Sequence, residues 1–339
     1  MTTRPLHTLT TAVLALATLA CERGAKTSTY AADPSVSFCR EVPRAANRAL
    51  SPVDVGSGWF SVYQVEPGVF AIIEPRQFQE AISYLVVGTR RALLFDSGIG
   101  LVPIRPVIER LTRLPVTVLN SHSHFDHVGG NAEFDDVIAL DTEYTRENER
   151  GKAHAMLKGE VDPESLCPPL PTGVDTSAFR TRGWRVSRRV KDGDVEELGQ
   201  RTLEILQVPG HTPDAIALHD REHHLLFTGD SYYDATIWLF VPETDLDAYE
   251  RSMARLVALA PSLNRLLPAH NTASVDPGRL GVVAHAVRTM RAGGGSRAAQ
   301  GEGRVLVTVG DVTIMTTPAL LAGQAGRAGA GGTGLAPTP

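Results

Sequence analysis

Four side chains that commonly bind metal ions lie within residues 121–127, which read SHSHFDH. The segment directly follows the apolar run VTVLN, which predicts a strand. Side chains two residues apart on extended backbone point the same way, so His122 and His124 can converge on one ion. Asp126 and His127 then project differently and could serve a second ion. Imidazole and carboxylate ligands together favour zinc, with iron or manganese as further options.

Three further candidate ligands each follow an apolar run and stand close to glycine or proline. His211 lies in PGHTP, Asp230 lies in TGD, and His270 lies in PAHN. Loops at the ends of strands build sites on a rigid scaffold, which favours a ligand role for all three. Together with the first motif they make seven candidate ligands. Seven ligands are enough for two ions that share one bridging carboxylate.

The residues around these motifs predict a strand-rich domain with helices between groups of strands. Apolar runs bounded by glycine, proline or charge predict strands, and apolar residues at helical spacing predict helices. The predicted strands are 60–65, 69–73, 82–88, 92–96, 116–120, 202–208, 215–220, 224–230 and 265–269, followed by a hairpin over 304–317. The predicted helices are 103–113, 142–157, 244–260 and 276–292, with an irregular insertion over 158–183. Two groups of strands, each ended by helix, predict two sheets face to face with helices outside.

The order of the four motifs, H-x-H-x-D-H, G-H-T-P, T-G-D and A-H-N, resembles the metallo-β-lactamase superfamily. The upstream segment LLFDSG, residues 93–98, is similar to that family's first motif, in which Asp96 is a structural support and not a ligand. The resemblance spans about residues 58–317 and implies an α+β fold, a four-layer αββα sandwich with the site along one edge. It implies a first metal on His122, His124 and His211, a second metal on Asp126, His127 and His270, and Asp230 as the bridge.

The resemblance further implies a metal-dependent hydrolase with two zinc ions. A hydroxide held between two ions is a nucleophile at neutral pH and would attack a carbonyl or phosphoryl centre. Asp126 could orient it and later move its proton. Tyr233, three residues after Asp230, resembles a tyrosine of family lactonases that donates a hydrogen bond to the substrate. Tyr232 competes for that role, and both tyrosines could instead pack in the core.

The residue at position 230 separates classes of substrate within the family. Antibiotic-hydrolysing members usually carry Cys or Ser at this position. An aspartate there, as in this chain, is similar to the residue found in thioesterases, lactonases and related esterases of the family. We therefore expect an ester, lactone or thioester as the substrate. The run Ile237-Trp238-Leu239-Phe240 either lines a pocket for an acyl or aromatic group or forms a buried strand. Asp214 stands where many members have glycine, and the sequence offers no mechanistic reason for it.

Three other functions remain open from the sequence. A β-lactam hydrolase is one, although Asp230 counts against it. A second is a mononuclear iron dioxygenase that acts on persulfides, because some family members use part of this ligand set in that way. A third is a catalytically silent metal-binding protein, which the complete ligand set disfavours.

The composition describes a globular protein and bounds its partners. The 339 residues are 42% hydrophobic and 21% charged, with a net charge of −5. A negative net charge argues against nucleic acid as a partner, because phosphate binding relies on clustered Lys and Arg. We expect a small-molecule substrate instead.

The two ends of the chain predict an exported protein with flexible termini. Residues 1–21 resemble an export signal that ends at a cysteine, Cys21, similar to the lipidation site of bacterial lipoproteins. Residues 22–57 predict a tether or arm, 58–317 the catalytic domain, and 318–339 a disordered tail rich in Gly, Ala and Pro. The protein would then be periplasmic or anchored to the membrane. In such an oxidising compartment Cys39 and Cys167 could pair.

Overall fold

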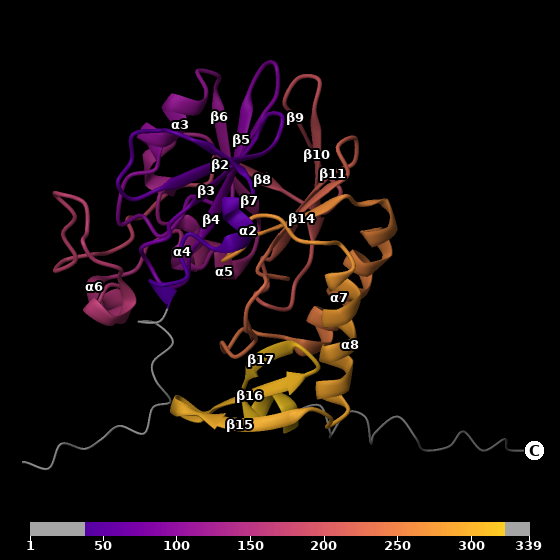
Figure 1. Ribbon diagram of the computed structural model, residues 1–339. Coiled ribbons are helices and arrows are strands. Elements are labelled where there is room, and N and C mark those ends of the chain that lie inside the picture. The colour runs from indigo at the N-terminus through magenta and orange to yellow at the C-terminus, as the bar shows by residue number, and fades with distance from the viewer. Residues whose placement is uncertain (1–37, 323–339) are drawn as a thin grey trace, which may run out of the picture. The chain divides into compact units, whose positions relative to one another are not determined.

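The computed structural model describes residues 38–322 and is built on two large sheets (Figure 1). The predicted export signal, Cys21 and most of the predicted tail lie outside the described residues. The first sheet has eight strands in sequence order. They are β1 (Ser51–Val53), β2 (Ser61–Glu66), β3 (Val69–Ile73), β4 (Ile82–Val87), β5 (Ala92–Phe95), β6 (Val116–Leu119), β7 (Val137–Leu140) and β8 (Arg188–Val190).

The second sheet has five strands in the order β14-β12-β11-β10-β9. They are β9 (Val195–Glu197), β10 (Thr202–Gln207), β11 (Ile216–Asp220), β12 (Leu225–Gly229) and β14 (Arg265–Pro268). A third, four-stranded sheet was not predicted. It comprises β13 (Ile237–Trp238), β15 (Ser296–Gln300), β16 (Arg304–Val309) and β17 (Val312–Thr316). The predicted hairpin over 304–317 is confirmed as β16 and β17.

Helices pack against the outer face of each large sheet, α7 (Leu246–Leu259) and α8 (Arg279–Arg291) on the second and α3 (Arg105–Leu111) on the first. Those longer than ten residues, α7 and α8, run side by side next to the second sheet (Figure 1). The shorter ones are α2 (Ala45–Arg48), α3, α4 (Phe125–Val128), α5 (Glu143–Asn148) and α6 (His154–Leu157). The predicted helix over 142–157 is thus two short helices, and the predicted insertion contains only the 3₁₀ turns Lys158–Glu160 and Pro163–Ser165.

Three apolar clusters hold these layers together. The central cluster fills the space between the two large sheets with side chains such as Tyr84 and Phe95 from one sheet and Phe227 from the other. A second cluster joins the second sheet to α7, α8 and the third sheet. The third joins the first sheet to α3. The order of layers is therefore helix, sheet, sheet, helix, which is the predicted αββα sandwich.

Part of the segment predicted as a tether is packed into the domain. β1 pairs with β2 in antiparallel register. Cys39 forms a disulfide with Cys167. At the other end, Leu320 and Leu321 continue past the expected boundary and pack against the second apolar cluster. The folded unit is therefore longer at both ends than the predicted 58–317.

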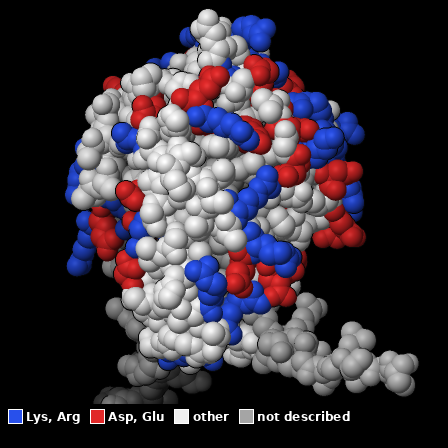
Figure 2. Space-filling view, turned by 90° about the vertical axis from the view of Figure 1, so that its right-hand side faces the viewer, with Lys and Arg blue, Asp and Glu red and all other residues white. Residues whose placement is uncertain are grey.

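The face of the molecule that Figure 2 shows carries charge of both signs. Positive and negative side chains are interspersed there around a broad area without charged side chains. Within residues 38–322, no helix is both long and apolar enough to cross a membrane.

Candidate metal centre

The seven candidate ligands meet because the strands that carry them end at one edge of the sandwich. β5 and β6 run parallel in the first sheet. β12 and β14 run parallel in the second, and β10 runs in their direction because two antiparallel pairings separate it from β12. Residues that follow the carboxyl ends of parallel strands emerge at the same edge. The ligand loops after β6, β10, β12 and β14 therefore face one another.

A glycine allows the two sheets to approach at this edge. Gly229, the last residue of β12, has φ +51°, and a Cβ atom there would lie 2.4 Å from Ser121 Cβ. The Ile216 N–H also donates to the Ser121 carbonyl at 2.6 Å. A larger residue at position 229 would push the HxHxDH loop away from Asp230. The glycine of T-G-D therefore has a steric role in assembling the centre.

His122, His124 and His211 form one of three groups of converging ligand atoms, here called the three-histidine group; the group that links it to the next consists of His122, His127 and Asp230. His122 Nε2 lies 2.8 Å from His124 Nδ1, and His211 Nε2 lies 3.2 Å from the same atom. His122 and His211 are buried and His124 is half-buried. Three imidazole nitrogens thus point at one small volume.

Asp126, His127 and His270 form the second group, here called the mixed group. His127 Nε2 lies 3.3 Å from Asp126 Oδ2 and 3.3 Å from His270 Nε2. All three side chains are buried. The two groups have different donor sets, because only the mixed group contains a carboxylate.

Asp230 lies between the two groups. Its Oδ1 is 3.1 Å from His270 Nε2 and 3.4 Å from His127 Nε2. Its Oδ2 is 3.5 Å from His211 Nε2 in the three-histidine group. One carboxylate oxygen therefore faces each group, which is the arrangement that a bridging ligand requires.

The outer nitrogens of three histidines are held by hydrogen bonds that orient the rings. His127 Nδ1 lies 3.0 Å from Asp96 Oδ2, and Asp96 Oδ1 accepts the Ser121 N–H at 2.6 Å. His211 Nδ1 donates to the Trp238 carbonyl at 2.9 Å. His270 Nδ1 donates to the Gln79 carbonyl at 2.8 Å. Such partners fix the tautomer and leave the inner nitrogen free to bind a metal.

The protonation states differ between the two groups. Burial lowers the pKa of His122 well below its usual value and that of His124 to about 3, so both imidazoles are neutral. Burial would also lower the pKa of His127, but the carboxylates of Asp126, Asp96 and Asp230 raise it well above its usual value. The pKa of His270 is raised in the same way, against burial, chiefly by Asp230. His127 and His270 thus hold protons whose positive charge balances the neighbouring carboxylates. A bound cation would supply that positive charge instead.

The seven side chains fit a pair of divalent cations. Asp230 Oδ1 is buried and makes no hydrogen bond, although two imidazole nitrogens face it. A buried carboxylate oxygen without a hydrogen bond, surrounded by imidazole nitrogens that converge on one another, is a donor set that a cation satisfies. The seven ligands are five histidines and two aspartates, so they offer only nitrogen and oxygen donors. Such a set suits zinc, iron or manganese.

Asp214 ties the loop of the three-histidine group together. The Asp214 carboxylate is 4% exposed. It accepts hydrogen bonds from Ser123 Oγ at 2.5 Å, Thr212 Oγ1 at 2.8 Å and Thr145 Oγ1 at 3.0 Å. Ser123 lies between two ligands of the HxHxDH motif, and Thr212 follows His211. The structure thereby explains the residue for which the sequence offered no reason.

The two tyrosines after Asp230 point in different directions. The Tyr233 ring lies 5.1 Å from the His270 ring, and its hydroxyl oxygen accepts the Trp238 N–H at 2.8 Å. The Tyr233 proton therefore stays available for donation. Tyr232 is 1% exposed and packs in the cluster that joins the second sheet to its helices. The structure brings Tyr233 to the centre and leaves Tyr232 in the core.

The run from Ile237 to Phe240 alternates between core and site. Ile237 and Leu239 are buried in the core, whereas Trp238 and Phe240 are half-buried. The Trp238 ring lies 6.3 Å from Phe78, which belongs to the β3–β4 loop, and 5.5 Å from Phe240. Ile237 and Leu239 therefore fit the interpretation as a buried strand, whereas a substrate pocket lined by Trp238 and Phe240 stays a prediction. These three rings, here called the aromatic mouth, lie beside the carbonyl groups that orient His211 and His270.

Several residues of the site carried no signal in the sequence. The Gln79 and Trp238 carbonyls act through the backbone, which any residue type could supply. Phe78 lies in the loop 74–81, far from every motif. A prediction that β3 runs parallel to β5 would have placed this loop at the ligand edge.

Known proteins resemble this chain in sequence and in structure. Residues 81–308 match the family described as the metallo-beta-lactamase superfamily. The acyl-coenzyme A thioesterase MBLAC2 of Gallus gallus is 33% identical over 235 residues, covering 62% of this chain and 80% of that protein. A hydroxyacylglutathione hydrolase of Polaromonas sp. is 30% identical over 159 residues, covering 45% of this chain and 48% of that protein. The solved structure of a metallo-beta-lactamase family protein from Thermus thermophilus has a TM-score of 0.51 and 20% identity, covering 67% of this chain and 81% of that one.

Proposed function

The chain belongs to the metallo-β-lactamase superfamily of metal-dependent hydrolases, and on that premise we propose that it hydrolyses a thioester with two zinc ions. The observation that carries the proposal is the position of Asp230, with one oxygen toward each group of ligands. A single ion would need only one group. The three-histidine group and the mixed group would each hold one cation, and Asp230 would bridge them.

When bound, the cations would polarise the substrate carbonyl and lower the pKa of a water to about 7. The histidines around Asp126 outweigh its burial and lower its pKa to about 2. Asp126 therefore stays ionised, and its free lone pairs can orient the attacking water. Burial, together with Asp230, raises the pKa of Tyr233 well above its usual value. Its hydroxyl thus keeps its proton and can donate a hydrogen bond to the carbonyl oxygen.

The overall reaction consumes one water. The water oxygen adds to the carbonyl carbon, the carbon–sulfur bond breaks, and the products are a carboxylic acid and a thiol. A proton from the water goes to the leaving thiolate. No oxidant or second substrate is needed.

The choice of thioester over lactone or simple ester has two supports. The first is the acyl-thioesterase named among the relatives, with which the chain shares 33% identity. The second is the aromatic mouth, because Phe78 and Trp238 offer half-buried apolar surface beside the carbonyls that orient His211 and His270; the Phe240 ring lies under the Arg304 guanidinium at 4.4 Å. Asp230 counts against a β-lactam substrate, because antibiotic-hydrolysing members of the family usually carry Cys or Ser at that position.

Export is part of the same proposal. The Cys39–Cys167 disulfide supports an oxidising compartment, because disulfides are rare in the reducing cytosol. We propose a periplasmic or membrane-anchored enzyme, with attachment through a lipid on Cys21. Labelling of cells with a radioactive fatty acid, compared between the natural chain and Cys21→Ser, tests the attachment. Equal labelling of both proteins would contradict it.

Elemental analysis of the purified protein, prepared without added metal, is the first test. About two zinc ions per chain, with turnover of medium-chain acyl thioesters, is the expected result. Lactones, simple esters and a β-lactam are tested in parallel, and a strong preference for one of these would replace the thioester. One iron per chain with oxygen consumption on a persulfide would overturn the hydrolase.

A further inference from the structure

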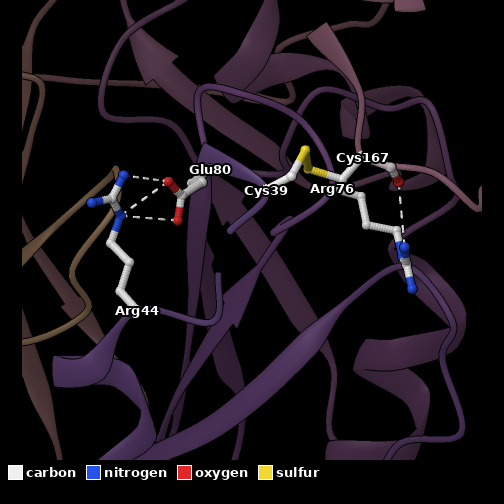
Figure 3. The surroundings of a disulfide bond; sticks show 5 residues. All are labelled: Cys39, Arg44, Arg76, Glu80 and Cys167. Carbon is white, nitrogen blue, oxygen red and sulfur yellow. Dashed lines mark hydrogen bonds and ion pairs between the residues drawn. A yellow bond between two sulfur atoms is a disulfide. The ribbon is translucent and has the colours of Figure 1, made fainter. Parts of the chain in front are cut away.

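The N-terminal arm, residues 38–50, is covalently attached next to the metal centre. Its Cys39 forms a disulfide with Cys167, 128 residues later in the chain. The Cys167 N–H donates to the Arg76 carbonyl at 2.8 Å, and Arg76 Nη1 donates back to the Cys167 carbonyl at 3.3 Å (Figure 3). Arg76 belongs to the β3–β4 loop, residues 74–81. The disulfide therefore fixes the arm to the loop whose Gln79 carbonyl orients His270.

Arg44 extends from the arm to Glu80 in the same loop (Figure 3). Its Nη2 lies 2.5 Å from Glu80 Oε1, and its Nε donates to the two carboxylate oxygens at 3.0 and 3.1 Å. The Glu80 side chain is 1% exposed. A carboxylate buried to this extent depends on a cation beside it. Asn271 Nδ2 also donates to Glu80 Oε1, at 3.1 Å, so this carboxylate joins the arm to the residue after His270.

Asn47 makes a second link between the arm and the same turn. This side chain is 2% exposed. Its Nδ2 donates to the Asn271 carbonyl at 2.7 Å, and its Oδ1 accepts the Ala273 N–H at 2.9 Å. The amide thus spans the backbone on the carboxyl side of His270. Two arm side chains therefore hold the two segments on either side of this ligand.

Both of these segments contain strained backbone. Glu80 has φ +47° and Asn271 has φ +63°. Residues other than glycine stay in this left-handed backbone conformation only where their surroundings hold them. The two segments also bond to each other, since the Asn271 N–H donates to the Glu80 carbonyl at 3.3 Å. His270 therefore takes its position from backbone that the arm keeps in an unfavourable conformation.

We propose that the disulfide-anchored arm positions His270 and thereby sets the affinity of the mixed group for its metal ion. Arg44 and Asn47 are the positioning residues, and the Cys39–Cys167 disulfide keeps them in place. The three-histidine group has no contact with the arm among the hydrogen bonds and ion pairs of the described residues. The proposal rests on the two-metal centre proposed above.

Stepwise titration of the metal-free, disulfide-bonded protein with Zn²⁺, in competition with a chelating indicator, tests this proposal. We assign the first equivalent to the three-histidine group and the second to the mixed group. We expect Arg44→Ala and Asn47→Ala to bind the second equivalent about tenfold more weakly, the lower end of the effect of removing outer partners of metal ligands. The first equivalent keeps its affinity. Co²⁺ titrations should show the same selectivity, with the absorption bands of the second equivalent altered. Arg44→Lys, which keeps the positive charge beside Glu80, should recover part of the lost affinity.

Arg40→Ala is the matched control, because Arg40 is an exposed arginine on the same arm. Both of its equivalents should bind as in the natural protein. Equal weakening of both equivalents in Arg44→Ala would contradict the proposal, since that pattern reports a general loss of structure. Two equivalents bound with unchanged affinity would contradict it as well. If the natural protein takes up only one ion, the two-metal function itself fails.

The disulfide supplies a variant that leaves every arm contact chemically intact. Cys39→Ser/Cys167→Ser removes only the covalent tether and avoids thiol reductants, which would compete for the metal. We expect a severalfold weaker second equivalent and an unchanged first one. This variant also decides the matter if Arg44→Ala does not fold. An unchanged second equivalent in it would overturn the role of the disulfide.

Discussion

The three-histidine group and the mixed group lie next to each other yet are built in different ways. The first consists of imidazoles that burial keeps neutral, on loops joined by Asp214 through hydrogen bonds to Ser123 and Thr212. The second contains Asp126, and its histidines keep protons because carboxylates surround them. His270 is also supported from a distant part of the chain, through Glu80 and Arg44.

The metal affinities of two adjacent groups can therefore depend on different parts of the molecule. A neutral, locally supported group should bind its ion over a wide range of pH. The metal affinity of the mixed group, which is charged and supported by a distant segment, should depend on pH and on the integrity of the arm. Asp230 faces both groups with its two carboxylate oxygens, so its loss should affect both of them.

Replacing Asp230 should have the largest effect. In Asp230→Ala the carboxylate between the two groups is lost, and each of the two proposed ions would lose a ligand together with a compensating negative charge. Turnover should fall on the order of 1,000-fold, because the metal ions supply several kcal/mol of transition-state stabilisation. Elemental analysis and a thioesterase assay measure the loss. Near-normal activity and metal content would rule out the bridging role.

Acidification should separate the two groups. Histidines with a raised pKa remain protonated until the pH exceeds that value, and a metal ion must displace those protons. Affinity of the mixed group should therefore fall as the pH is lowered, by about tenfold per pH unit for each proton displaced. The three-histidine group, with pKa values lowered by burial, should change little down to about pH 5. Zinc titrations between pH 8 and pH 5 show this, and a parallel decline of both equivalents would refute it.

Removing Asp214 should weaken metal binding by the three-histidine group, whose affinity changes little with pH. Asp214→Ala leaves three hydroxyl groups without their common acceptor and frees the loops that carry His122, His124 and His211. The first equivalent of zinc should bind about tenfold more weakly, while the second is less affected. Asp214→Asn keeps an acceptor oxygen and should recover most of the affinity. A selective loss of the second equivalent would reverse the assignment.

The smallest effect should come from a residue that belongs to neither group. Tyr233→Phe removes the hydrogen bond that we propose Tyr233 donates to the substrate. It should lower kcat about tenfold, which corresponds to about 1.4 kcal/mol of activation free energy. Metal content should stay the same. Tyr232→Phe is the matched control, because that ring is buried in the core away from the ligands, and its kcat should be unchanged. Equal loss in both variants would indicate a packing role for the pair.

Part of the fold could be predicted because its strands are buried on both faces. Runs such as VFAII and ALLFD stand out between charged residues, and they became β3 and β5. The strand Ser296–Gln300 could not be predicted, since its five residues SRAAQ are all exposed. Its strand conformation comes from pairing with β16, and pairing leaves no hydrophobic pattern in the sequence. The four-residue run VIAL of β7 was too short to separate from a buried turn of helix.

The residues of the candidate site also separate into those that could be predicted from the sequence and those that could not. HxHxDH, Asp230 and His270 could be singled out because ligand chemistry needs particular side chains, and local spacing and strand ends indicate where they project. Arg44, Asn47 and Phe78 could not be singled out, since their partners lie far away in sequence. Asp214 was visible only as a departure from a family pattern, with no partner to explain it.

Reading the residues alone was enough to find the side chains that could bind metal ions, to place them after strands, and to recognise the family that the chain resembles. These features depend on residue types and on short-range backbone geometry. Three features became visible only in the folded chain: Asp230 faces both groups, Tyr233 and not Tyr232 reaches the centre, and a disulfide fixes the arm to the loop that orients His270. Each of these depends on how two sheets pack and in what register, which is the sum of many weak contacts spread over the whole chain. No local pattern of residues contains that sum.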